Sequence, residues 1–568
     1  MTRCVRVITE NAAVDRAFDY ELGEAWADVR VGDRVRVDFN HRSLRAWVVE
    51  EVPPRRELKP VKKWLGRGPA PEMIDLLRWA ATRWCAPLSR FLLAASPPVV
   101  VRELPDPPPR ADPDLRLDEQ ATALAPGVVL AAPTSDPLGL VVHAHLSTLH
   151  EPGSLLVVVP TEGWARRLSG RLEQRGLAVA QGEAQWDRMR AGWPVIVGAR
   201  GAALAPTARL RGAVVIDADD EALRSESSPT WDALSVVVER CRRDRAPWWC
   251  TSVAPSPTLL SLGEARPWGS LASVASGWPR VSVLDRREGD PHDGVLLRPA
   301  LDAAHRALAG SEAVAVAVIL QRLGHGRLYA CRHCGELARC AVCGQAEVPD
   351  EGHLTCAEGH ERRANFCRHC SSTNLRAVRV GVSTLARDVA AQLGQSAQEV
   401  TAGSTLEATS RVLVGTEAVF NRVRRCGVVI FVDFDQYLLA PRESARRAAL
   451  VAVAKAGRLV GARAEGRGEV LVQSRRHDEV IDALVRGDVR SVIEEDRANA
   501  ELLSLPPYGA LARVSGAAAA DFVAQVDESV SVRRVGEGYV LRAPDVETLT
   551  RALRAVARPP GRLRLEID

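Results

Sequence analysis

"LRGAVVIDADD", residues 210–220, is the stretch that best indicates the fold. Its central apolar run is unbroken and ends on Asp217, with Asp219 and Asp220 close behind. A continuous apolar run indicates a strand buried on both faces, as in a parallel sheet covered by helices. Acidic residues directly after such a strand are typical of a nucleotide site at the carboxyl edge of the sheet. The stretch therefore raises the question of whether this chain hydrolyses ATP.

Similar apolar runs alternate with helical patterns and predict two α/β lobes. In residues 115–265 these runs are "GVVLAAP", "GSLLVVVP", "VIVGAR", "LRGAVVIDADD" and "PWWCTSVAPS". In residues 266–490 they are "AVAVAVIL", "SRVLVGTEAVF", "CGVVIFVDFDQ" and "GEVLVQS", on either side of a cysteine-rich insertion at 330–372. The fold class is therefore multidomain α/β.

Smaller domains are expected at both ends of the chain. Residues 1–98 contain the strand-like pieces "CVRVIT", "RVRVDF" and "AWVVEEV" and then a helical pattern, which predicts a β-rich domain closed by a helix. The prolines of residues 99–114 favour an extended linker. Residues 495–568 predict strand, helix, hairpin, helix and strand, with the last helix beginning at Asp545 and stopping at Pro559.

Composition indicates a globular protein without a membrane anchor. The 568 residues are 46% hydrophobic and 26% charged, and no stretch resembles a signal peptide or a transmembrane span. We expect a cytoplasmic protein that does not associate with membranes. Because the net charge is only +4, nucleic-acid binding would depend on local basic faces. The arginine clusters in "RRCGVVIF", "ESARRAAL" and "VVERCRRDR" could follow phosphates or could be ordinary solvated faces.

The cysteines indicate bound metal. Seven of the twelve lie between residues 331 and 370, in "CRHCGELARCAVCG", "CAEGH" and "CRHC", whereas the other five are scattered and are expected to be small core residues. Paired ligands of this spacing predict two structural zinc ions. The pairs are Cys331/Cys334, Cys340/Cys343, Cys367/Cys370 and Cys356 with His360, for which His353 and His369 are competitors.

The order of these features resembles the PriA family of primosomal replication-restart helicases over nearly the whole chain. The matching stretches are "VDRAFDYELGEAWADVRVGDRVRVDFNHRSLRAWVV", "LDEQATAL", "SVAPSPT", "RVLVGTEAV", "AGR" at 456–458 and "LPPYGALARVSG". The resemblance implies two RecA-like helicase lobes, an N-terminal DNA 3′-end-binding domain, a two-zinc ribbon insertion and a small C-terminal α+β domain. It also implies an outer zinc on Cys331, Cys334, Cys367 and Cys370 and an inner zinc on Cys340, Cys343, Cys356 and a fourth ligand. Glycine stands where the family has that last cysteine, so His360 is inferred.

The motifs for ATP hydrolysis depart from this family. A phosphate loop needs backbone N–H donors and a lysine, GxxxxGK[ST], yet the corresponding stretch is "PTSDPLGLVV" and none of the four lysines follows a glycine. The acidic motif keeps Asp217 but has Ala218 where the family has the catalytic glutamate. In "AKAGRLVG", Arg458 remains and Gly461 replaces a second arginine. Asp217 and Arg458 are therefore degenerate remnants, and neither ATP nor Mg²⁺ is an expected cofactor.

The resemblance also implies a pocket for the 3′ end of a DNA strand, built from Phe18, Asp19, Tyr20 and Lys59. An aromatic ring can stack on a terminal base, a carboxylate can accept from a 3′-hydroxyl, and a lysine can meet phosphate. Without that resemblance, the triplet would be interpreted as a turn with one core aromatic residue. Asn40 replaces a nearby family glycine, and only the proline-rich stretch stands where the family has a winged-helix domain.

Three functions follow as hypotheses. The first is a PriA-like replication restart protein that binds stalled, branched or single-stranded DNA and helps to assemble the primosome without ATPase or helicase activity. Its expected partners are single-strand-binding protein and the replicative helicase with its loader. The second is a genuine ATP-dependent 3′–5′ DNA helicase with unorthodox phosphate contacts. The third is a zinc-ribbon scaffold for protein interactions without fork recognition.

Overall fold

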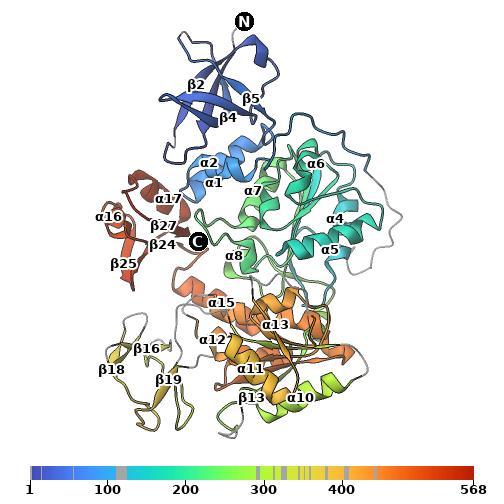
Figure 1. The fold of residues 1–568 in the computed structure, drawn as a ribbon, viewed down its shortest axis with the longest axis vertical. Coiled ribbons are helices and arrows are strands. Elements are labelled where there is room, and N and C mark those ends of the chain that lie inside the picture. The colour runs from blue at the N-terminus through green and yellow to red at the C-terminus, as the bar shows by residue number, and fades with distance from the viewer. Residues whose placement is uncertain are drawn as a thin grey trace.

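The computed structural model describes residues 3–14, 16–55, 57–110, 124–289, 294–310, 314–321, 329–342, 346–350, 352–356, 360–377, 382–401, 409–440 and 444–568. A small strand-rich domain lies at one end, followed by two α/β lobes in succession (Figure 1). The C-terminal domain lies beside the first lobe, and the cysteine-rich insertion lies beside the second. The expected multidomain α/β fold class is confirmed.

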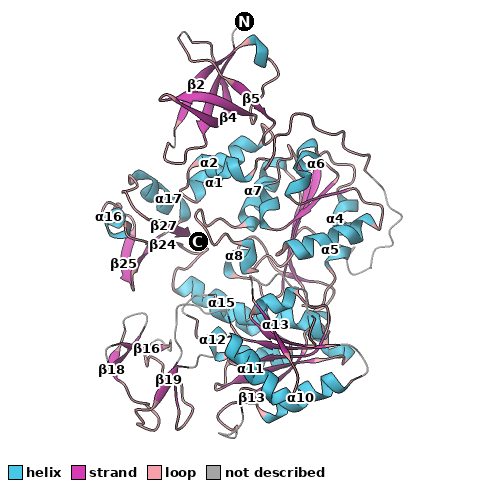
Figure 2. Ribbon diagram, in the orientation of Figure 1, coloured by secondary structure: helices cyan, strands magenta, loops and turns pink. Residues whose placement is uncertain are grey.

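The N-terminal domain begins with strands, drawn in magenta in Figure 2. They form a five-stranded antiparallel sheet in the order β2-β1-β4-β3-β5. Two helices follow the strands, where the sequence analysis expected one. The elements are β1 (Arg3–Thr9), β2 (Ala17–Leu22), η1 (Glu24–Trp26), β3 (Arg34–Phe39), β4 (Arg42–Val52), β5 (Lys63–Gly66), α1 (Met73–Arg83) and α2 (Leu88–Ala94). Alternating residues such as Val5, Val7, Val35 and Val37 fill its core.

An extended segment follows these helices. The described residues 99–110 form neither helix nor strand, as the prolines predict, and residues 111–114 lie outside the described part of the chain.

The first lobe is a seven-stranded sheet in the order β12-β6-β11-β10-β7-β9-β8, and its recorded strand pairs are all parallel. Every residue of β10 is buried, as the unbroken apolar run predicts. The strands are β6 (Gly127–Leu130), β7 (Ser154–Val158), β8 (Val179–Gln181), β9 (Val195–Gly198), β10 (Leu210–Val215), β11 (Trp248–Ser252) and β12 (Arg266–Pro267). The helices are α4 (Pro137–Ser147), α5 (Glu162–Glu173), η2 (Glu183–Gln185), α6 (Trp186–Ala191), η3 (Arg200–Leu204), η4 (Glu221–Leu223), α7 (Ala233–Asp244) and α8 (Pro257–Leu260).

The second lobe is a six-stranded parallel sheet in the order β13-β23-β22-β14-β21-β20, preceded by the short helix α9 (Leu271–Ser276). Its strands are β13 (Arg280–Asp285), β14 (Ala315–Ile319), β20 (Ala397–Val400), β21 (Val412–Gly415), β22 (Cys426–Phe431) and β23 (Glu469–Ser474). Its helices are α10 (Arg298–Ala309), α11 (Val382–Leu393), η5 (Glu417–Asn421), α12 (Asp435–Leu438), α13 (Ala445–Val460), η6 (Arg463–Glu465), α14 (Glu479–Arg486) and α15 (Arg490–Leu502).

The insertion and the C-terminal domain are built from short antiparallel strands. The insertion holds β15 (Tyr329–Cys331), β16 (Glu347–Asp350), β17 (His353–Cys356), β18 (Arg362–Ala364) and β19 (Leu375–Ala377). The C-terminal domain holds β24 (Ala510–Ser515), α16 (Ala519–Val523), β25 (Ser531–Val535), β26 (Gly538–Ala543), α17 (Val546–Ala555) and β27 (Arg564–Ile567). Its element order is the one predicted, and the Asp545 carboxylate caps α17 by accepting from the N–H of Thr548 at 2.7 Å.

Candidate functional site

The loop after β6 places a carboxylate at the N-terminus of α4. Asp136 is the N-cap of α4 and accepts from the N–H of Leu138 at 3.1 Å. The guanidinium of Arg171 on α5 holds both carboxylate oxygens at 2.9 and 2.5 Å. Partial burial acts in the opposite direction, yet Arg171 keeps the pKa of Asp136 below its usual value. The helix terminus is therefore already occupied by a carboxylate from within the chain.

Each aspartate after β10 has a different intramolecular partner. Asp217, in a left-handed conformation at φ 52°, forms an ion pair of 2.5 Å with Arg458 of the second lobe. Asp219 accepts from the hydroxyl of Ser252 at 2.8 Å and from the N–H of Ser256 at 3.1 Å. Asp220 caps η4 and forms an ion pair of 3.0 Å with Lys455. All three carboxylates of this acidic cluster thus have contacts within the protein.

Arg458 is positioned by lobe 1 on three sides. Besides binding Asp217, its Nε donates to the carbonyl of Pro133 at 3.0 Å, and its guanidinium lies 4.8 Å from the ring centroid of Trp164 on α5. Burial raises the pKa of Asp217, and the charge of Arg458 offsets part of that increase. The structure therefore brings together the two residues identified as remnants of a catalytic device, and it places them in direct contact.

The pocket between the lobes is small. It is lined by Asp217, Asp219, Asp220, Ser252, Val253, Val451, Ala454, Lys455 and Arg458, and the space open to water-molecule centres is about 10 Å³, room for about one water. Gly461, at the position of the expected second arginine, ends α13 with a φ of 90°, and a Cβ there would lie 2.6 Å from a carboxylate oxygen of Glu465.

In the N-terminal domain, the predicted DNA-end residues do not all face one side of the sheet. Strand alternation places Phe18 and Tyr20 on the core face of β2 and Asp19 on the other face. Tyr20 is buried and donates to the carbonyl of Asp38 at 2.8 Å, and burial raises its pKa. Phe18 is half-buried, with its ring centroid 4.6 Å from that of Phe39.

Asp19 lies between two arginines. Its carboxylate accepts from Nε of Arg6 at 2.9 Å and from Nη1 of Arg55 at 3.2 Å. Lys59 is exposed, and its carbonyl accepts from the N–H of Glu21, so that it lies beside β2. Phe18 and Lys59 thus keep accessible surface on neighbouring segments, whereas Asp19 is already ion-paired. Sequence reasoning identified Asp19 but had no signal for the two arginines.

Asn40 stands where glycine was expected, and the backbone conformation at this position is one that favours glycine. Asn40 and His41 have φ values of 45° and 62° in the turn between β3 and β4. Glycine adopts this left-handed conformation without strain, and asparagine is among the side chains that tolerate it best. The replacement therefore keeps the turn.

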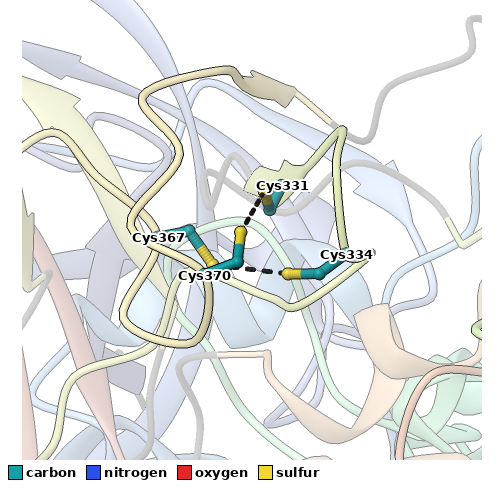
Figure 3. Close-up of side chains that lie close together, drawn as sticks. All are labelled: Cys331, Cys334, Cys367 and Cys370. Carbon is teal, nitrogen blue, oxygen red and sulfur yellow. Dashed lines mark hydrogen bonds between the residues drawn. The ribbon is translucent and has the colours of Figure 1, made fainter.

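The outer cysteine cluster brings four possible metal ligands together. The Sγ atoms of Cys331, Cys334, Cys367 and Cys370 lie within 4.8 Å of one another (Figure 3). The Cys331–Cys370 and Cys334–Cys367 separations are 3.5 Å, close to the roughly 3.8 Å between sulfurs at Zn–S distances of about 2.3 Å. The residues present therefore fit a zinc ion.

The two knuckles of this cluster share one backbone pattern. Gly335 donates to the carbonyl of Cys331 at φ 76°, and Ser371 donates to the carbonyl of Cys367 at φ 59°. The N–H of His333 also points at the Cys331 sulfur, 3.4 Å away. The two CxxC turns thus have the same backbone hydrogen bond, and each has a left-handed residue after the second cysteine.

The second cluster joins Cys340, Cys356 and His360, whose ligand atoms lie within 4.8 Å of one another. Nδ1 of His360 is 3.9 Å from Sγ of Cys356. Cys343 lies outside the described residues. His360 is thus brought to the inner cluster, whereas neither His353 nor His369 belongs to a described group of this kind. Both clusters could bind zinc.

Other residues singled out from the sequence have structural contacts. The scattered cysteines Cys4, Cys85, Cys241, Cys250 and Cys426 are buried, as expected. Two of the arginine clusters are largely occupied within the fold. Arg242 and Arg243 bind Glu239, and Arg446 binds Glu495 at 2.7 Å. Fully buried Arg240 donates to three backbone carbonyls. No helix in the described part of the chain is long and apolar enough to span a membrane.

The sequence is similar to those of replication restart proteins. Residues 6–97 match the model of the PriA 3′DNA-binding domain (3′BD). The probable replication restart protein PriA of Mycobacterium bovis is 27% identical over 639 aligned residues, which cover 95% of this chain and 93% of that protein. The replication restart protein PriA of Treponema pallidum is 27% identical over 56% of this chain and 51% of its own length.

Among solved structures, yeast Dbp5 bound to RNA and ADP–BeF₃ matches at 11% identity and a TM-score of 0.35, covering 76% of this chain and 92% of Dbp5. The Mycobacterium smegmatis helicase Lhr, bound to single-stranded DNA and AMP-PNP, matches at 11% identity and a TM-score of 0.35, covering 85% and 61%. Along 95% of its length, this chain is therefore similar in sequence to PriA replication restart proteins, and its residues 6–97 match the model of their 3′DNA-binding domain.

Proposed function

We propose that this protein is a PriA-like replication restart protein that binds branched or single-stranded DNA and does not hydrolyse ATP. The main support is the interlobe cleft. A site for a triphosphate needs cations and N–H donors that are not already neutralised by the protein, because the ligand is an anion. Here lobe 1 presents acceptors, namely Asp217, Asp220 and the Pro133 carbonyl, and lobe 2 presents Lys455 and Arg458. The two lobes complement each other and leave no net positive site for phosphate.

The loss of catalysis follows from the same residues. Phosphoryl transfer is accelerated by positioning the phosphates and neutralising their charge. Ala218 cannot orient water, and Asp136 occupies the helix terminus that would hold phosphate. The matching stretch of the second lobe offers one arginine, Arg458, and that arginine is held by Asp217.

The test is nucleotide binding and hydrolysis by zinc-loaded full-length protein, with and without forked DNA. We expect fork binding without turnover, and an Asp217→Ala variant controls for a contaminating ATPase. DNA-stimulated hydrolysis that disappears in this variant would instead establish a motor with unorthodox phosphate contacts.

We assign DNA-end recognition to the accessible surface that half-buried Phe18 and exposed Lys59 keep on neighbouring segments of the N-terminal domain. Lys59→Ala should weaken binding of forks with a 3′ end at the junction by about threefold or more, because a phosphate contact is lost. Lys63→Ala, another exposed lysine of the same domain, is the matched control. Equal affinity for forks with and without a 3′ end would argue for a protein-interaction scaffold. In a restart complex, single-strand-binding protein and the replicative helicase with its loader are the proposed partners.

The insertion is proposed to hold two structural zinc ions, one on Cys331, Cys334, Cys367 and Cys370 and one on Cys340, Cys343, Cys356 and His360. The bound ions would take the place of a large apolar core, since the small apolar cluster at this insertion joins Ala330 and Leu337 to Leu439 of the second lobe. Purified protein should contain two zinc ions per chain. His360→Ala should lower the content toward one, whereas His369→Ala should leave it at two. Loss of zinc in the His369 variant alone would reassign the ligand.

A further inference from the structure

The contact between the lobes is closely fitted as well as charged. The Asp217 and Asp220 carboxylates are buried, at 7% and 6% exposure, and each is paired across the cleft. Lys455 also binds Glu417 of its own lobe at 3.1 Å, which fixes the ammonium at the cleft wall. Opening the lobes would leave two carboxylates without their cations.

Glycines allow the two backbones to approach. A Cβ on Gly457 of α13 would lie 2.9 Å from Pro279 and 3.4 Å from Pro133 of the loop after β6. A Cβ on Gly277 would lie 2.4 Å from the Cβ of Ala132, and the carbonyl of Gly277 accepts from Thr134 at 2.9 Å. The loop that would hold phosphate in an ATPase therefore packs directly on the second lobe.

A ligand shifts a conformational equilibrium only by its differential affinity for the two states. In a cycling motor, the charge of the nucleotide draws the lobes together. Here the cations of α13 are already satisfied by carboxylates of lobe 1, so closure needs no ligand and a nucleotide would have to displace those carboxylates to bind.

We propose that Asp217–Arg458 and Asp220–Lys455 form an intramolecular latch that holds the lobes closed without nucleotide, so that they bind DNA as one rigid unit. The closed state depends only on the contacts across the cleft between the lobes. Its consequence for DNA rests on the proposed function.

The experiment follows hydrogen exchange by mass spectrometry in zinc-loaded full-length protein. The readouts are peptides covering 131–138 and 448–460, on the two sides of the cleft, with small-angle scattering as a measure of overall opening. Arg458→Gln removes the latch cation. Arg467→Gln is the matched control, because Arg467 lies in the same lobe in an exposed pair with Glu465.

We expect Arg458→Gln to speed exchange on both sides of the cleft by about tenfold and to enlarge the particle, with strands β7 and β22 unchanged. Arg467→Gln and added ATP should change neither readout. A double variant, Asp217→Asn with Arg458→Gln, should exchange no faster than Arg458→Gln alone, since the two substitutions remove the same ion pair.

Two results would overturn the latch: exchange in Arg458→Gln equal to that of the unmodified protein, or slower exchange across the cleft when ATP is added to the unmodified protein. Failure of the proposed function gives a different signature. Absence of fork binding under every condition would refute DNA recognition and leave the exchange result standing, whereas an intact latch predicts equal fork affinity with and without ATP.

Discussion

The first lobe is joined to its neighbours by two contrasting contacts. Toward the N-terminal helices and the C-terminal domain it shares one continuous apolar core that includes Phe91, Trp231 and Phe522. Toward the second lobe, two ion pairs and the hydrogen bond from Thr134 cross the contact. Val253 and Ala254 also pack on the apolar core of that lobe. An apolar contact persists whatever the charge state of the protein, whereas a charged one can be opened by removing a single cation.

The largest effect is expected at the apolar contact. Phe91 of α2 is 1% exposed and packs against Trp231 of lobe 1 with 6.5 Å between ring centroids. Phe91→Ala should lower the free energy of unfolding by about 3–5 kcal/mol in urea titrations, since it removes transfer free energy and leaves a cavity. Leu93→Ala, on the same helix at 56% exposure, is the control. Equal losses for the two variants would contradict a shared core.

The next effect tests the charged contact. Lys455→Met leaves the buried Asp220 without its cation and should cost about 2 kcal/mol, less than a fully buried pair because the lysine side chain is 23% exposed. The loss should appear in urea unfolding as an earlier transition. An unchanged midpoint would mean that Asp220 finds another partner and that the interlobe contact rests mainly on shape.

Measuring stability over a range of pH also distinguishes the charged contact from the apolar one. Burial raises the pKa of Asp217 above its ordinary value although Arg458 opposes this. The folded protein then binds a proton more readily than the unfolded chain, so this group makes stability fall as pH rises from about 4 through its folded-state pKa. Asp217→Asn should remove that contribution. The urea concentration at the unfolding midpoint should then change less between pH 4.5 and 7.5 than it does in the unmodified protein. A steeper profile in the variant would show the sign to be wrong.

The smallest effect is expected at a surface pair of the second lobe. Arg467 and Glu465 are both exposed, and solvent screens their attraction. Arg467→Gln should change the free energy of unfolding by about 0.5 kcal/mol or less. A loss as large as that of Lys455→Met would mean that exposure does not separate the two kinds of pair.

Many elements of the fold could be predicted because their patterns lie within short stretches of the sequence. Unbroken apolar runs identified β6, β7, β10 and β11, and alternation with turn signals identified the element order of the C-terminal domain. The helix α2, which follows the predicted helix closely, and the short edge strands were missed. Their patterns are too brief to be separated from the neighbouring loop without knowing what they pack against.

The candidate site was predicted only in part. The sequence by itself determined that none of the four lysines follows a glycine, that Ala218 follows Asp217 and that the cysteines occur in ligand-spaced pairs. It also placed Asp217 and Arg458 in separate motifs. Only the tertiary structure decided that these two side chains neutralise each other, because they come from segments 241 residues apart. The chemistry of each residue can be recognised from a short stretch of sequence. Whether opposite charges meet depends on which distant segments the two folded lobes bring together.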